Sequence, residues 1–84
     1  MVYYLIVCRS LTYAQRTARA LERAGISAYI MRTPRAIAGE GCSHAVRVSQ
    51  RRMNDALRAL SRVGMPAQRV FVLESDGNYR EVAL

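Results

Sequence analysis

The 84-residue sequence has no tryptophan, one phenylalanine, two prolines and only two cysteines. Two cysteines are too few for the disulfide framework of a small secreted domain, so a cytoplasmic protein is expected. No apolar run approaches the roughly 18 residues of a membrane-spanning helix. The apolar start VYYLIVC also lacks the basic region and cleavage site of a signal peptide. We therefore expect no association with a membrane.

Lysine is absent too: all 13 basic residues are arginines, and against six acidic residues they give a net charge of +7. A basic surface suits nucleic acid, an acidic protein or an anionic small molecule. The arginines are scattered, and Arg51-Arg52 is the only adjacent pair. This spread is typical of solvated faces and indicates no basic tail for nucleic acid.

Several catalytic signatures are missing. The sequence has no phosphate-binding loop, no dinucleotide-binding glycine fingerprint and no C-x-x-C pair. Its acidic residues form no evident pair for general acid–base chemistry. These absences disfavour a self-contained enzyme.

The hydrophobic pattern predicts a single domain over residues 1–84, with the element order β-α-β-β-α-β. Ser10 or Thr12 is expected to cap the first helix and Ser49 the second, and Gly25 and Gly64 to end them. The predicted strands are 2–8, 27–32, 44–49 and 68–73, with a short fifth strand over 79–84.

The chain contains an internal echo, because the segment 20–28 (ALERAGISA) resembles the segment 59–67 (ALSRVGMPA). Each is a helix end, a glycine stop and the approach to a strand. Two similar halves in this order favour an α+β, ferredoxin-like two-layer sandwich. In that fold an antiparallel sheet of order 4-1-3-2 carries both helices on one face. A swapped dimer of the same unit and a different open sandwich are the alternatives.

The expected fold brings the two cysteines together. The end of the first strand lies beside the start of the third, so Cys8 and Cys42 are expected at one rim. Cys42 shares side-chain parity with His44, which directs its thiol toward the N-terminus of the first helix. Arg9 and Arg35 add to the positive field there. Such settings lower the pKa of a cysteine from about 8.5 to about 3.5–7.5.

The same residues also have ordinary structural interpretations. Cys8 ends an apolar strand and is expected in the core. A single histidine on a strand, such as His44, is more often a partly buried structural group than a base. Tyr3, Tyr4 and Tyr29 are expected to pack on the strands.

Three stretches of the sequence, YYLIV, AGISAYIMRTPR and I-x4-C-S-x-A-V-R-V, resemble the selenium/sulfur carrier-like family of small bacterial and archaeal domains. The resemblance covers about residues 3–73. Ala36 stands where the family usually has glutamate, and Ser43 where glycine follows the cysteine. Cys8 and His44 replace apolar residues, and the loop is one residue longer. The sharpest matches are Pro34, Arg35, Ile37, Cys42, Ala45 and Arg47.

The resemblance implies that Cys42 is an acceptor thiol that carries sulfur or selenium as a persulfide or selenosulfide. It implies two partners, a donor resembling a cysteine desulfurase and an acceptor protein, and no cofactor beyond the carried element. We add Cys8 as a candidate resolving thiol and His44 as a candidate base. The candidate binding residues at the rim, in the loop and in the motif are Arg9, Ser10, Pro34, Arg35, Gly41 and Arg47.

Other functions stay open. One is a non-catalytic module that binds a protein or senses a ligand. Another is RNA binding, which the third strand HAVRVS disfavours because it has no aromatic residue for base stacking. A third is a zinc site built from Cys8, Cys42 and His44, although no metal is expected. A homodimer is also left open.

Overall fold

The computed structural model describes residues 2–39 and 44–84, and the predictions for Gly41 and Cys42 therefore lie outside the described residues. Its regular elements are β1 (Tyr3–Cys8), α1 (Leu11–Arg23), β2 (Tyr29–Arg32), β3 (His44–Ser49), α2 (Met53–Arg62), β4 (Arg69–Leu73) and β5 (Tyr79–Val82), with two 3₁₀ turns, η1 (Arg35–Ile37) and η2 (Gln50–Arg52).

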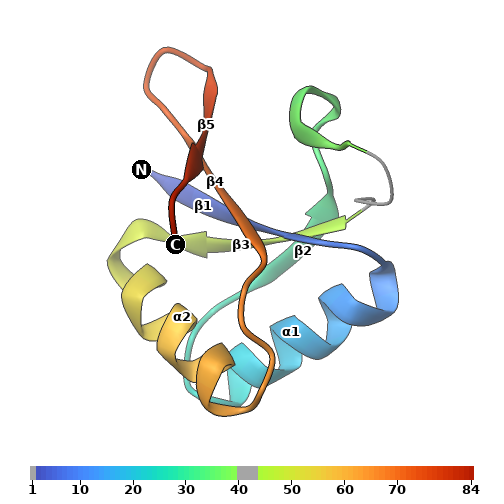
Figure 1. Cartoon of the computed structure of the whole chain (residues 1–84). Coiled ribbons are helices and arrows are strands. Elements are labelled where there is room, and N and C mark those ends of the chain that lie inside the picture. The colour runs from blue at the N-terminus through green and yellow to red at the C-terminus, as the bar shows by residue number, and fades with distance from the viewer. Residues whose placement is uncertain (1, 40–43) are drawn as a thin grey trace.

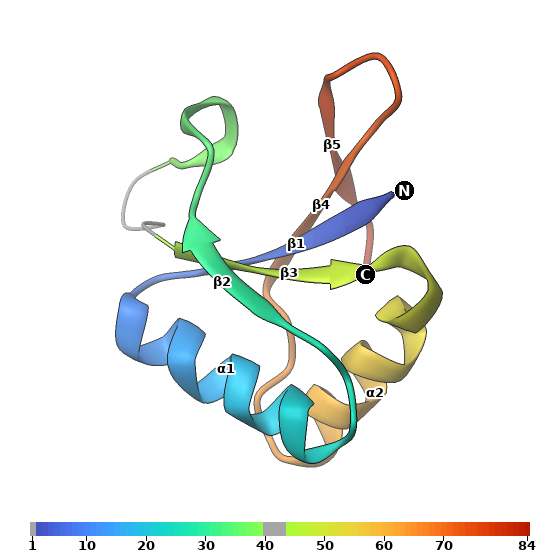
Figure 2. The same cartoon turned by 180° about the vertical axis from the view of Figure 1, so that it is seen from behind.

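The strands form one antiparallel sheet in the order β2-β3-β1-β4-β5. Read from β4 to β2, this is the predicted order 4-1-3-2, and β5 extends the sheet beyond β4. Both helices lie under one face of the sheet, and η1 and the β4–β5 hairpin rise on the other side (Figure 1; Figure 2, from behind). The α+β prediction is confirmed, including the fifth strand.

The internal echo is confirmed as two helix ends of the same type. Gly25 and Gly64 both have positive φ, 79° and 75°, which glycine adopts without strain. In each case the residue after the glycine donates its N–H to a leucine carbonyl five residues back, Ile26 to Leu21 and Met65 to Leu60, both at 2.9 Å. This is the hydrogen bond of a Schellman ending.

Besides shifts of one or two residues at the ends of β1, β4 and β5, three features differ from the predictions. The second strand begins at Tyr29 rather than Ser27, so its regular part is only four residues long. Ser49 precedes η2 and makes no side-chain capping hydrogen bond, and α2 begins only at Met53. The predicted loop contains η1, which buries Ile37.

The sheet separates two hydrophobic clusters. The larger lies between the sheet and the helices and includes Leu21, Val46 and Leu60, all fully buried. The smaller lies on the opposite face, which we call the open face, and consists of Leu5, Val7, Ile37, Ala45 and Phe71. The side chain of Ile37 in η1 is thus what covers this part of the open face.

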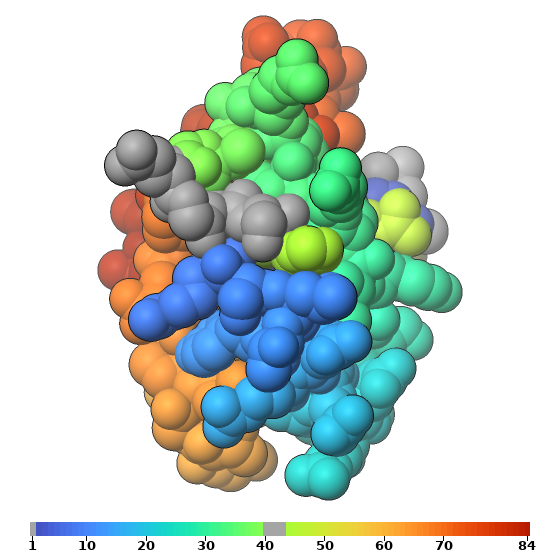
Figure 3. Space-filling model, turned by 90° about the vertical axis from the view of Figure 1, so that its right-hand side faces the viewer, coloured from blue at the N-terminus to red at the C-terminus, as the bar shows by residue number. Residues whose placement is uncertain are grey.

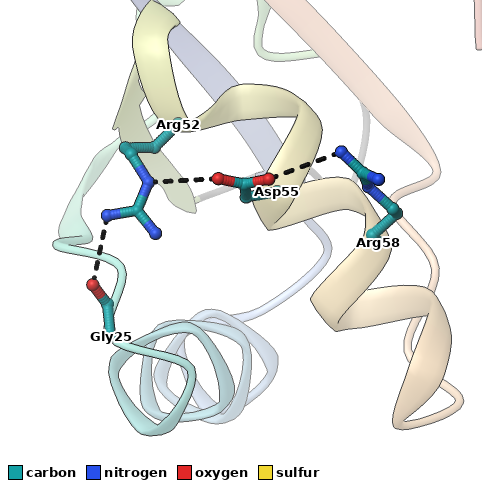
Figure 4. Close-up of polar contacts among 4 residues, drawn as sticks. All are labelled: Gly25, Arg52, Asp55 and Arg58. Atoms are coloured by element: carbon teal, nitrogen blue, oxygen red, sulfur yellow. Dashed lines mark hydrogen bonds and ion pairs between the residues drawn. The ribbon is translucent and has the colours of Figure 1, made fainter.

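Polar contacts join the start of α2 to the end of α1 (Figure 4). Arg52 lies 3.4 Å from the carboxylate of Asp55 and donates a 3.3 Å hydrogen bond to the carbonyl of Gly25. Arg58 lies 3.4 Å from the same carboxylate. These groups are exposed, so each ion pair contributes at most about 1 kcal/mol. These polar contacts align the two helices with each other, and the buried side chains of the core stabilise their packing.

Candidate functional site

The end of β1 and the start of β3 lie side by side at one edge of the sheet, the rim, as the sequence predicts. Cys8, the last residue of β1, pairs with His44, the first residue of β3, and α1 begins shortly afterwards at Leu11. His44 also pairs with Arg32 at the end of β2. In Figure 3 the start of α1 (blue), η1 (green) and the segment leading into β4 (orange) meet on this side of the molecule.

Cys8 lies in the larger cluster, with 2 % of its surface exposed. Its thiol donates to the carbonyl of Ile6, with the sulfur 3.6 Å from the oxygen, and lies 3.9 Å from Oγ1 of Thr17. Thr17 is the one buried polar residue of the described core. The prediction that Cys8 belongs to the core is therefore confirmed. Its role as a resolving thiol stays a prediction.

A cavity of about 180 Å³ reaches Cys8 from the rim. Its walls come from the end of β1, the first turns of α1, the end of α2 and the segment leading into β4. Among the residues that line it are Cys8, Tyr13, Thr17, Leu60, Met65 and Arg69. The cavity thus borders the side of the core where the cysteine lies.

Ser10 and Arg9 organise the start of α1. Oγ of Ser10 accepts a 3.1 Å hydrogen bond from the N–H of Tyr13, so Ser10 is the N-cap and Thr12 is not. The first turn of α1 contains no acidic residue. The Arg9 guanidinium lies 5.8 Å from the centre of the Tyr13 ring, within reach of a cation–π contact. This end of the helix is therefore positive and has no carboxylate of its own.

We expect Ser10→Ala to lower the free energy of unfolding by about 1 kcal/mol, because the Tyr13 N–H loses its acceptor. Urea denaturation would measure the loss. The matched control is Thr12→Ala, which removes a hydroxyl two residues later in the same turn and should change stability by a few tenths of a kcal/mol at most. Equal losses in the two variants would contradict the assignment of the cap.

The segment before the candidate thiol is anchored by one buried side chain, that of Ile37. Pro34 precedes η1, Arg35 begins it with its side chain exposed, and Ile37 fixes it to the open face. Gly39 has φ of 55°, and a Cβ built on it would lie 3.5 Å from Nη1 of Arg69. The described part of this segment thus ends at Gly39, beside the side chain of Arg69 at the start of β4.

Arg47 does not join the rim. Alternate residues of a strand point to opposite faces, and Val46 lies in the cluster beneath the helices. His44 has the parity of Val46, whereas Arg47 pairs with Leu5 and Tyr29 and lies on the open face. Among the predicted residues that the structure describes, Arg47 therefore lies on the opposite side of the sheet from Cys8.

Sequence reasoning missed two features of this region. The position of Arg69 depends on the pairing of Val7 with Arg69 in the β1–β4 register, which no local pattern announces. Tyr29 was expected to pack on the strands, but it is 61 % exposed at the sheet edge and contacts Arg47. The alternation of residues along β2 could have placed Tyr29 and Met31 on one face, but it could not have identified their neighbour.

Two further observations bear on the other functions. Within residues 2–39 and 44–84, no three His, Cys, Asp or Glu side chains are grouped closely enough to hold a metal ion. No helix in the same residues is long and apolar enough to cross a membrane. The proposed zinc ligand Cys42 lies outside the described residues, so the zinc site stays untested.

The comparisons with known proteins point to one family. No curated protein and no solved structure matches the chain significantly. A family model described as "Putative Se/S carrier protein-like" matches residues 3–72. That match covers most of the chain and includes the η1 segment, both cysteines and the arginine of β3. The chain belongs to this selenium/sulfur carrier-like family.

Proposed function

We propose that the chain carries sulfur or selenium on the thiol of Cys42 and delivers it to an acceptor protein. The observation that carries the proposal is the family match, which spans position 42. The described residues on either side of this position are Gly39, which lies close to Arg69, and His44, which pairs with Cys8.

The electrostatics of the rim support a thiolate in this region. A helix N-terminus stabilises a nearby anion by about 0.3–1 kcal/mol. The start of α1 lies beside the pairing of Cys8 with His44, and its first turn has no carboxylate to compete with an anion. A thiolate is the form of cysteine that attacks a sulfur atom. Cys42, two residues before His44 in the sequence, is the cysteine that we propose for this chemistry.

The proposed transfer balances without an external oxidant. The Cys42 thiolate attacks the terminal sulfur of a persulfide on the donor, a new S–S bond forms, and the donor's S–S bond breaks. The donor cysteine leaves as a thiolate and takes up a proton, and Cys42 becomes a persulfide. An acceptor thiolate then attacks the terminal sulfur, and Cys42 leaves as a thiolate. A selenium atom in the terminal position would follow the same steps.

The test is loading by a cysteine desulfurase supplied with ³⁵S-labelled cysteine, followed by non-reducing gels and intact mass. Wild type should gain one sulfur atom, which a reductant releases. Cys42→Ser should gain none, because serine cannot form a persulfide. Cys8→Ala is the control and should be loaded like wild type, since Cys8 is buried in the core.

Two results would contradict the proposal. One is equal labelling of wild type and Cys42→Ser, which would locate the sulfur elsewhere. The other is no labelling of wild type under conditions in which an established acceptor is loaded. The family's chemistry would then not apply to this chain, and a binding module would be the better description.

A further inference from the structure

Three side chains form a stack on the open face, and we name it the Tyr3–Arg47–Tyr29 stack. Arg47 in β3 lies directly opposite Tyr29 in β2, and Tyr3 in β1 is its diagonal neighbour, since Tyr3 pairs with Ser49. Cζ of Arg47 is 4.3 Å from the centre of the Tyr3 ring and 4.9 Å from the centre of the Tyr29 ring. The guanidinium is therefore flanked by an aromatic ring from each neighbouring strand.

The donors of Arg47 are not used within the described residues. Its Nε is buried and has no hydrogen-bond partner there, and no described carboxylate forms an ion pair with it. A buried donor without an acceptor costs about 1–3 kcal/mol, more when it is charged. The other arginine on the open-face positions of the strands, Arg69, already pairs with Glu81 at 3.4 Å. Of the two arginines at open-face positions of the described strands, Arg47 is thus the one without a carboxylate partner among the described residues.

The geometry limits what that group can be. Cζ of Arg47 lies over both rings, so we expect an acceptor to approach the part of the guanidinium that the rings leave uncovered. A planar carboxylate matches the edge of a guanidinium with two parallel hydrogen bonds. A single-stranded nucleic acid would instead need ring faces on which to stack bases and a row of cations for its phosphates. Here the rings of Tyr3 and Tyr29 already face Arg47, and the second open-face arginine is paired.

We propose that the Tyr3–Arg47–Tyr29 stack binds an acidic side chain of the protein with which the chain exchanges sulfur. The inference rests on the proposed function for the identity of the partner. The net charge of +7 favours an acidic partner surface. Tyrosine and arginine are also the residues that most often dominate the energy of a protein interface. Tyr29, the ring of the stack on the edge strand, is 61 % exposed, so a partner can reach this side of the stack.

The test is an NMR titration of ¹⁵N-labelled protein with a short acetylated poly-glutamate peptide. A poly-glutamine peptide serves as the neutral control and an oligouridylate as the nucleic-acid probe. We expect saturable shifts of the Arg47 Nε–H signal and of the Tyr29 amide with poly-glutamate alone, weakened by salt. Arg47→Met should reduce the affinity about tenfold, the effect of losing a charged hydrogen-bonding partner. Arg62→Met, an exposed arginine at the end of α2, should leave it unchanged.

Three results would overturn the inference: no shift at Arg47, equal affinity in Arg47→Met and wild type, or tighter binding of oligouridylate at the same residues. The amide spectrum of each variant shows whether it is folded. The titration does not involve Cys42. A successful titration with failed sulfur loading therefore removes the proposed function and the identity of the partner but keeps the carboxylate-binding stack, and the reverse result removes only this inference.

Discussion

Leu21→Ala is expected to lower the free energy of unfolding by about 2–5 kcal/mol, the usual cost of truncating a buried leucine. Leu21 is fully buried in the cluster beneath the helices, and its carbonyl also accepts the N–H of Ile26 in the helix ending. A domain of this length typically has about 4–13 kcal/mol of stability in total. The substitution should therefore remove a large share of it, as a shift of the urea midpoint with an unchanged slope.

The matched control is Leu11→Ala, which makes the same change at the other end of α1. Leu11 is 45 % exposed, so its truncation leaves no cavity in the core and should lower the free energy of unfolding by less than about 1 kcal/mol. Similar losses at the two positions would show that the side of α1 assigned to the core is wrong. Circular dichroism at each denaturant concentration would follow both variants.

Ile37→Ala is expected to have the second largest effect, a loss of about 2 kcal/mol, at the low end of the range for buried isoleucine. Ile37 is 9 % exposed and is the η1 residue in the smaller cluster, where it covers Leu5, Val7 and Phe71. Removing it takes away the apolar contact that fixes η1 to the sheet. The amides of Ile37 and Ala38 donate within this turn, at 3.0 Å and 3.4 Å, and should exchange faster with solvent.

Ile30→Ala provides the control for this variant, because Ile30 is the same residue type on the neighbouring edge strand and is 39 % exposed. It should change neither stability nor exchange in η1 by much. If Ile37→Ala left the η1 amides as well protected as in wild type, Ile37 would not be the anchor of this segment. Measuring stability and exchange on the same samples separates local opening from global unfolding.

Much of the fold could be predicted because its signals are local. The glycines at 25 and 64 end the helices at the predicted places, and the continuous apolar run of β1 marks a central strand. η1 was missed because a three-residue turn has no periodicity to detect. The boundary of α2 was misplaced because Ser49 is a suitable cap by residue type, yet the chain makes a 3₁₀ turn before the helix.

The candidate site could be predicted only in part, because some of its contacts depend on residues that are distant in the sequence. The structure confirms that the end of β1 lies beside the start of β3, since this depends on strand order, whereas the predicted approach of Cys8 to Cys42 lies outside the described residues. The contacts of Arg47 and Arg69 depend on which residues lie opposite one another on the open face. Those partners come from strands distant in the sequence, so neither composition nor spacing could identify them.

The central position of β1 has a consequence for biosynthesis. β1 is made before the other strands of this sheet, and both of its neighbours follow later, β3 beyond α1 and β2, and β4 beyond α2. While the ribosome extends the chain, the apolar segment YYLIVC has no strand to pair with, which exposes it to aggregation. Pairings between distant segments also raise the contact order and slow folding. Formation of the central strand is thus a late event, completed only when β4 has emerged.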